Sequence, residues 1–136
     1  MVAIASASIA GCSAPKDATA APVNVRLTDF DIESSTPTVA SPNVEFDVRN
    51  AAPATHEFVV VRSNLRPAAL PLAADGLSVD EDALDVAGEI SEVPARTTGT
   101  VELHLRPGRY VFFCNLDGHY LGGMYGSVRV TSPRAA

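Results

Sequence analysis

Hydrophobic and polar residues alternate along several short segments of the chain, which is the pattern of β-strands that bury one face. Residues 44–48 alternate apolar and charged side chains. Residues 100–105 repeat the pattern, with Val101, Leu103 and Leu105 on one face. Both segments are therefore predicted to be β-strands with one face on the core and the other face in solvent.

Four further segments are strand-like. Residues 56–62 contain four consecutive apolar side chains, as expected for a strand buried on both faces. Residues 23–33 alternate with a phase slip near Asp29, which predicts a strand interrupted by a bulge. Residues 109–114 and 125–131 are also strand-like. Seven or eight strands in total predict an all-β fold, a Greek-key β-sandwich of two packed antiparallel sheets.

Residues 63–92 break the strand pattern. Ser78 and Glu81 have the spacing of a capping box, which predicts a short helix ending near Gly88 as an excursion from the sandwich. The segment is acidic, and its acidic side chains form either a solvated helix face or a surface that docks a basic partner. The acidic cluster consists of Asp80, Glu81, Asp82 and Asp85.

The N-terminal segment predicts export. Residues 1–11 are small or apolar and uncharged, as in the apolar region of a secretory signal, and are too short to span a bilayer. Ile9-Ala10-Gly11-Cys12 resembles the bacterial lipobox, in which the cysteine thiol is acylated after cleavage. An ordinary cleaved signal or a disordered tail is the alternative. Residues 12–22 have the composition of a flexible tether, and residues 23–136 are the predicted folded domain.

The chain has two cysteines, Cys12 and Cys114. Two cysteines in an exported protein can pair as a disulfide. If Cys12 carries lipid, however, Cys114 keeps a free thiol. The lipobox predicts an extracytoplasmic protein held to the membrane by its lipid anchor only, in the bacterial periplasm or on the outer face of the cytoplasmic membrane.

Length and charge limit the possible functions. At 136 residues the chain is long enough for one domain with its own core, and we expect a monomer. The formal net charge is -6, from 16 acidic and 10 basic residues, and no basic stripe is present. Nucleic acid binding is therefore not expected.

Chemistry-bearing residues gather between two predicted strands. The chain has three histidines, two cysteines and two methionines. One of each lies within residues 114–124, namely Cys114, His119 and Met124. The same cluster would arise if all three residues had purely structural roles, as a buried cysteine, a surface histidine and a core methionine. A thiolate, imidazoles and a thioether are also the ligand set of a trigonal copper site, which needs a second histidine. His56, at the start of a buried strand, is the candidate, whereas His104 points outward beside core residues.

On these residues the chain resembles the cupredoxins, the type 1 blue copper proteins. The motifs are "THEFVV" and "PGRYVFFCNLDGHYLGGMYGSVRV", and the resemblance covers about residues 23–130. The Cys-x4-His-x4-Met spacing is more similar to the rusticyanin and sulfocyanin type than to plastocyanin. The resemblance implies one copper ion, with a thiolate from Cys114, imidazole nitrogens from His56 and His119, and a weak axial thioether from Met124.

Two further expectations follow from the resemblance. Glu57 replaces the asparagine that follows the first histidine in plastocyanin and azurin, and its backbone N–H is expected to support the thiolate. Electrons are expected to leave through the solvent edge of His119. An apolar docking patch would then receive transient redox proteins, and it consists of Leu116, Tyr120, Leu121 and the small residues Ala51 to Ala54. The alternative is that some of these side chains only pack the loop.

The implied function is one-electron transfer between extracytoplasmic redox partners, without enzymatic activity. A binuclear copper centre needs two cysteines in the loop, and multicopper oxidases have histidines beside the cysteine, where this chain has Phe113 and Asn115. A hydrolase would give Met124 no role, and a thioether is a poor zinc ligand. Copper storage or delivery in the cell envelope is the main alternative function.

Overall fold

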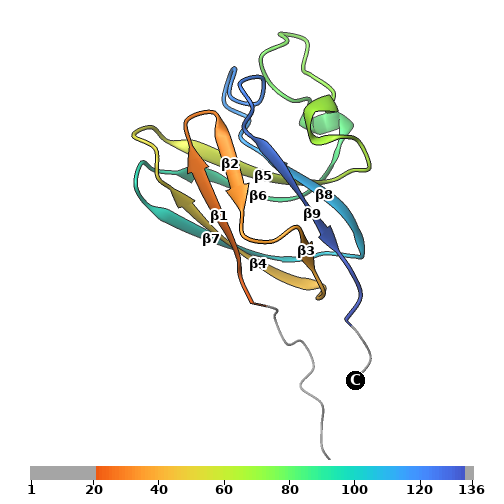
Figure 1. Cartoon of the computed structure of the whole chain (residues 1–136). Helices are drawn as coiled ribbons and strands as arrows, with labels where there is room; N and C mark the ends of the chain where they lie inside the picture. The colour runs from red at the N-terminus through yellow and green to blue at the C-terminus, as the bar shows by residue number, and fades with distance from the viewer. Residues whose placement is uncertain (1–20, 134–136) are drawn as a thin grey trace, which may run out of the picture.

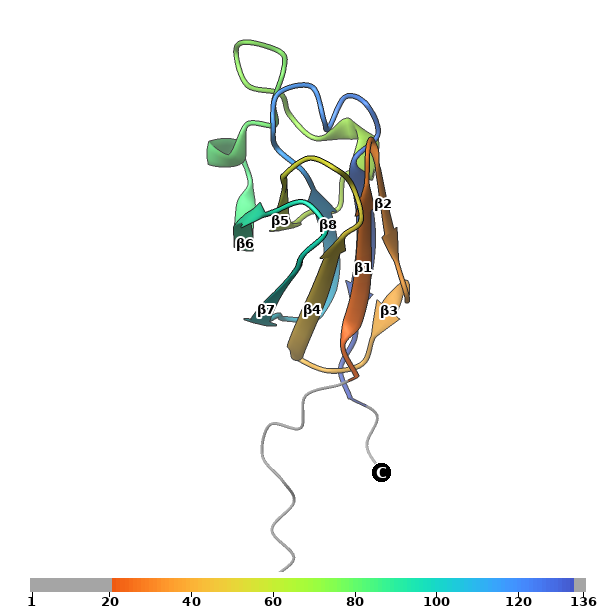
Figure 2. The same cartoon turned by 90° about the vertical axis from the view of Figure 1, so that its left-hand side faces the viewer.

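The computed structural model describes residues 21–133 and contains two β-sheets packed face to face (Figures 1 and 2). Nine strands and two short 3-10 helices lie in this part of the chain. The elements are β1 (Val23–Thr28), β2 (Asp31–Ser34), β3 (Thr38–Val39), β4 (Asn43–Asn50), β5 (His56–Arg62), η1 (Pro67–Ala69), η2 (Glu81–Ala83), β6 (Asp85–Val93), β7 (Thr98–His104), β8 (Gly108–Phe113) and β9 (Tyr125–Val130).

The sheets confirm the predicted all-β sandwich but are not purely antiparallel. One sheet has the order β2-β1-β4-β7, and the other has the order β3-β9-β8-β5-β6. The pairs β1–β4 and β3–β9 are parallel, whereas the remaining pairs are antiparallel. The prediction of two antiparallel sheets is therefore wrong in these two pairs, because alternation of side chains is the same in both kinds of pairing.

The alternating strands bury their apolar faces between the sheets. Phe46 of β4 and Phe58 of β5 are fully buried, with ring centroids 5.5 Å apart, and Phe58 lies 5.5 Å from Phe112 of β8. Strand β5 is apolar on both sides because Val59 and Val61 belong to a second buried cluster. That cluster lies beneath the segment between β5 and β6, from which Leu70 and Val79 contribute.

The phase slip near Asp29 is a turn rather than the predicted bulge. Strands β1 and β2 pair as a hairpin in which Thr28 lies opposite Asp31, so Asp29 and Phe30 form a two-residue turn. Phe30 adopts a left-handed φ of 63° and is 56% exposed, although the alternation placed it on the core face. A tight hairpin turn needs such a conformation, which is unusual for a bulky residue.

The predicted helix is a single 3-10 turn. Asp80 is the N-cap of η2 and makes no side-chain cap hydrogen bond, so the capping box of Ser78 and Glu81 does not form. Residues 85–93 are strand β6, which pairs with β5 through Gly88 and its neighbours. The excursion thus spans only residues 63–84, because the β-branched residues after it join the sheet.

The loops that carry the candidate ligands lie at one end of the sandwich. In both views the β1–β2 turn, the β4–β5 loop and the β8–β9 loop occupy this end (Figures 1 and 2). The start of β1 and the end of β9 lie at the opposite end. Within residues 21–133, no helix is long and apolar enough to cross a lipid bilayer. The predicted signal segment and the lipidation site Cys12 lie outside the described residues.

Candidate metal centre

Three of the predicted ligands meet at this end of the sandwich. The Nδ1 atoms of His56 and His119 are 3.2 Å apart. The Cys114 Sγ lies 3.8 Å from Nδ1 of His56 and 3.5 Å from Nδ1 of His119. These three residues form the candidate metal-binding group among the described residues. Side chains from β5 and from the β8–β9 loop are thereby brought together across 58 residues of sequence.

The separations match a small trigonal site. A point equidistant from three atoms with these spacings lies about 2 Å from each, close to the ~2.0–2.3 Å bonds that imidazole and thiolate form with zinc, a metal of similar size. Two imidazole nitrogens and one thiolate are the trigonal set that binds copper. The residues present therefore fit a copper ion without rearrangement of the backbone.

Met124 is tied to the same group by its backbone. Its N–H donates to the carbonyl of His119 at 3.1 Å, and its carbonyl accepts the N–H of Cys114 at 3.1 Å. The side chain is fully buried. By contrast, His104 lies exposed on β7, where its Nδ1 is 2.9 Å from Oδ1 of Asn43, so it takes no part in the cluster.

The sulfur of Cys114 is free, buried and supported by backbone N–H groups. The N–H of Glu57 donates to Sγ at 3.3 Å, which confirms that the backbone after His56 supports the sulfur. Burial raises the pKa of the Cys114 thiol, and the N–H groups of Glu57 and Leu116 partly oppose that rise. The thiol is therefore poorly ionised by itself, and a bound cation would supply the missing stabilisation of the thiolate.

His56 is held as a neutral ligand. Burial lowers its pKa, and repulsion from His119 lowers the pKa further, while the carboxylate of Asp29 opposes both effects. Strand β5 shifts register against β6 between His56 and Phe58. Such an irregularity redirects side chains at the end of a strand. The neutral ring keeps a lone pair on one nitrogen for a metal.

Glu57 differs from its neighbours because its carboxyl group is half-buried beside other acids. Burial raises the pKa of Glu57, and repulsion from Glu81 and Glu89 raises it further. A hydrogen bond from the backbone N–H of Asn115 opposes the rise.

The β8–β9 loop is shaped by glycines and by the excursion. Gly118 and Gly123 have φ values of 80° and 112°, conformations that residues with a Cβ rarely adopt. The side chain of Asn115 bonds to the backbone of Val79 and to the carboxylate of Glu81. The segment between β5 and β6 thus braces the ligand loop, a role that the sequence signals only by a polar residue directly after the cysteine.

Asn50 fixes the loop before His56. Its buried side-chain amide donates to the carbonyls of Ala54 at 2.7 Å and Val93 at 2.8 Å. Its Oδ1 accepts the N–H of Ala52 at 3.0 Å. Sequence reasoning missed this role, since an asparagine at the end of a strand most often marks only a turn. These bonds set where β5 begins and therefore where His56 lies.

The β1–β2 turn contributes two residues that the sequence did not assign to the site. Oδ1 of Asp29 lies 3.6 Å from Nε2 of His56. The ring of Phe30 meets the ring of His119 edge-on, with centroids 5.8 Å apart. The phase slip near Asp29 was the available signal, but the bulge interpretation left these side chains away from the ligands.

The three large side chains of the predicted docking patch have different environments. Leu121 is 54% exposed, and Leu116 is partly buried against the core. Tyr120 is only 3% exposed. Its hydroxyl donates to the carbonyl of Pro67 and accepts the N–H of Leu70. Its side chain therefore braces the segment between β5 and β6 instead of facing a partner.

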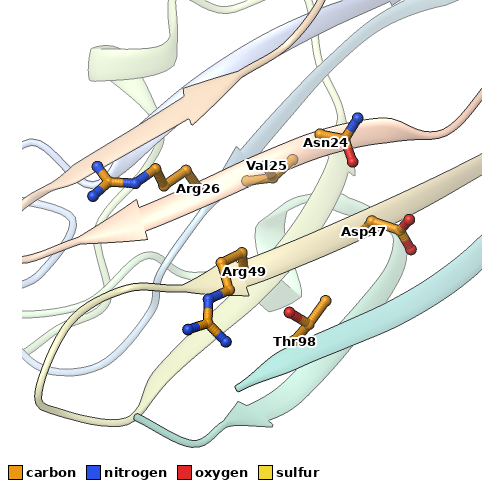
Figure 3. Close-up of a pocket in the computed structure, with 6 residues that line it drawn as sticks. All are labelled: Asn24, Val25, Arg26, Asp47, Arg49 and Thr98. Carbon is orange, nitrogen blue, oxygen red and sulfur yellow. The ribbon is translucent and has the colours of Figure 1, made fainter. Parts of the chain in front are cut away.

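A surface hollow on β1 and β4 has a different character. It has a volume of about 290 Å³, and none of the four predicted metal ligands lines it. Figure 3 shows its polar side chains along neighbouring strands. Because the paired Arg26 and Arg49 lie beside Asp47, the hollow has mixed charge and lacks the clustered soft donors of a metal site. The lining residues are Asn24, Val25, Arg26, Asp47, Arg49 and Thr98.

No protein-family model and no curated protein sequence matches the chain. Solved structures do. Auracyanin B is 24% identical over 88% of this chain and 93% of its own, with a TM-score of 0.57. Auracyanin A, a "blue" copper protein from Chloroflexus aurantiacus, is 19% identical over 82% of this chain and 100% of its own, with a TM-score of 0.58.

Rusticyanin from Thiobacillus ferrooxidans is 18% identical over 83% of this chain and 80% of its own, with a TM-score of 0.58. Auracyanins and rusticyanin are cupredoxins, and the likeness extends over nearly the whole described domain. With its two-layer sandwich and a His-Cys-His cluster between the loops at one end, this chain has the cupredoxin fold.

Proposed function

We propose that the protein is a mononuclear type 1 copper protein that carries single electrons between extracytoplasmic redox partners. The observation that carries this proposal is the convergence of the Cys114 sulfur and two imidazole nitrogens within 4.8 Å of one another. The backbone of Met124 is hydrogen-bonded to Cys114 and His119, and its thioether is the expected axial ligand. The likeness to auracyanin A, which is a "blue" copper protein, supports the choice of metal.

The protein's own residues hold the site nearly constant in shape. Bound copper would supply a one-electron couple between Cu(I) and Cu(II). The ligands come from two sheet-anchored segments, and the hydrogen bond from Glu57 N–H fixes the sulfur. Cys114 and Met124 are fully buried in the same core cluster, so water is kept from the sulfur. A rigid, dry ligand set changes little when an electron is added, and this favours fast transfer.

The route for the electron is the exposed side of His119. This residue is the least buried of the three ligands. The apolar side chains of Phe30 and Leu121, both more than half exposed, are candidates for the surrounding docking patch, together with the partly buried Leu116. A small apolar patch suits brief encounters with redox proteins better than lasting complexes.

The proposed anchor leaves this end of the molecule accessible. Acylation of Cys12 would tether the protein through residues 12–22, which join the domain at the start of β1. The start of β1 lies at the end of the sandwich opposite the ligand loops (Figure 1). A lipid anchor on the extracytoplasmic face would therefore leave the copper end free to meet partners, and no second copy is needed to complete the site.

Electron transfer and copper storage differ in whether the metal stays bound during redox cycling. We expect copper-loaded protein to undergo repeated reduction and oxidation in cyclic voltammetry with an unchanged midpoint. Elemental analysis after gel filtration should still give one copper per chain. Release of copper to a Cu(I) chelator on each reduction would instead assign the protein to storage or delivery.

Replacement of Met124 with leucine should keep the copper and raise the reduction potential. Loss of a weak axial donor favours Cu(I), and we expect an increase on the order of 59 mV, equal to a tenfold change in relative affinity for the two oxidation states. Leucine has nearly the volume of methionine, so the free energy of unfolding should fall by less than about 1.5 kcal/mol. The measurements are voltammetry and denaturant unfolding. Complete loss of copper binding would show that the thioether is not a weak axial ligand.

A further inference from the structure

The β1–β2 turn contacts the imidazoles of both histidine ligands. Asp29 places Oδ1 3.6 Å from Nε2 of His56, and Phe30 packs edge-on against His119. The contact of Asp29 lies away from the cluster of ligand atoms, since it is made to Nε2 of His56 whereas Nδ1 faces His119. The turn therefore lies where it can orient the histidine rings.

Nε2 of His56 needs a partner. It is a buried nitrogen without a hydrogen bond among the described residues. Leaving such a buried polar group unpaired is unfavourable. The carboxylate of Asp29 lies beside it, slightly beyond hydrogen-bond length. Because the Asp29 side chain is 55% exposed, a small rotation brings an oxygen into range without disturbing the core.

Phe30 holds the turn in place. Its left-handed φ of 63° carries the ring over Gly122, where a Cβ would clash with Phe30 Cδ1. The backbone carbonyl of Phe30 lies close to Gly123, 3.1 Å from the position of a Cβ on that residue. The turn therefore packs against two glycines of the ligand loop, and this packing fixes Asp29 beside His56.

We propose that Asp29 is a positioning residue for the copper ligand His56. Its carboxylate accepts a hydrogen bond from Nε2–H, so the ring proton stays on Nε2 and the Nδ1 lone pair points into the cluster. The effect of Asp29 on metal affinity rests on the proposed copper function. Carboxylates that hold a ligating histidine in this way commonly change metal affinity by about 10–100-fold.

The metal-free protein offers a test that does not depend on copper. With the proton on Nε2 of His56, the 3.2 Å contact between the Nδ1 atoms requires His119 to donate and His56 to accept. We expect 15N NMR of the full, metal-free chain to show a single Nε2–H tautomer for His56. Asp29→Ala should convert it to a mixture of tautomers. Asp29→Asn keeps an oxygen acceptor and should retain the Nε2–H form.

Copper binding provides the second readout. Asp29→Ala should weaken Cu(II) binding by about tenfold or more, measured by competition with a chelator of known affinity. Asp31→Ala is the matched control, since it removes an equal charge two residues away, at the exposed start of β2. Asp31→Ala should leave both the tautomer and the affinity unchanged.

The outcomes separate this inference from the proposed function. If Asp29→Ala and Asp31→Ala give the same His56 tautomer and the same copper affinity, Asp29 does not position His56. A mixed tautomer in the unaltered protein would overturn the inference as well. If the unaltered chain binds no copper, the proposed function fails, and the tautomer of the metal-free chain still decides whether Asp29 acts on His56.

Discussion

Replacement of Cys114 with serine should abolish the intense visible absorption of the copper-loaded protein. That absorption requires a thiolate-to-copper bond, and Cys114 supplies the sulfur that lies beside both Nδ1 atoms. A serine hydroxyl is isosteric but does not ionise at neutral pH, so it is a poor copper ligand. We expect complete loss of the band and at least a hundredfold decrease in Cu(II) affinity, on the order of 3 kcal/mol.

Cys12→Ser is the matched control for this prediction. It removes the other cysteine and with it the predicted lipidation site, and it should leave the absorption band unchanged. Absorption spectra of both variants at one equivalent of Cu(II) provide the measurement. A band that survives in Cys114→Ser, or disappears in Cys12→Ser, would show that the sulfur has been assigned to the wrong cysteine.

Replacement of Asn50 with alanine should have the largest effect on stability. The change removes three hydrogen bonds made by a fully buried side chain and leaves two carbonyls and one N–H without their partner. With about 1 kcal/mol or more for each bond, we expect a decrease of about 3–5 kcal/mol in the free energy of unfolding. Urea unfolding of the metal-free protein provides the measurement.

The same change should weaken copper binding, because Asn50 sets the position of the loop before His56. We expect a tenfold or larger loss of Cu(II) affinity under conditions in which the variant is still folded. Asn43→Ala is the control, because the side chain of Asn43 bonds to the exposed His104, and its cost should stay below about 0.5 kcal/mol. Equal losses in both variants would mean that Asn50 has no special role in the fold.

The strands and the ligands were predictable from different kinds of information. Strand β5 was predicted with its observed ends, because a run of four apolar residues is typical of a strand that is buried on both faces. His56, Cys114 and His119 were found because their residue types are rare in this chain and occur in a known order. The structure then brought the three ligand atoms together as expected.

The remaining features were not predictable from local pattern. Alternation does not distinguish parallel from antiparallel pairing, so the β1–β4 pair was missed. A bulge and a two-residue turn produce the same phase slip, and Phe30 is not a residue type that indicates a left-handed turn. The contact of Asp29 with His56 depends on that turn, and therefore it could not be seen before the hairpin was known.

The most direct test of the copper assignment is titration of the full, metal-free chain with Cu(II), followed by visible and EPR spectroscopy. We predict an intense thiolate-to-copper absorption that saturates at one equivalent, together with the narrow copper hyperfine splitting of a type 1 site. Binding without this absorption, or saturation at more than one equivalent, would contradict the central claim that these residues form a single blue copper centre.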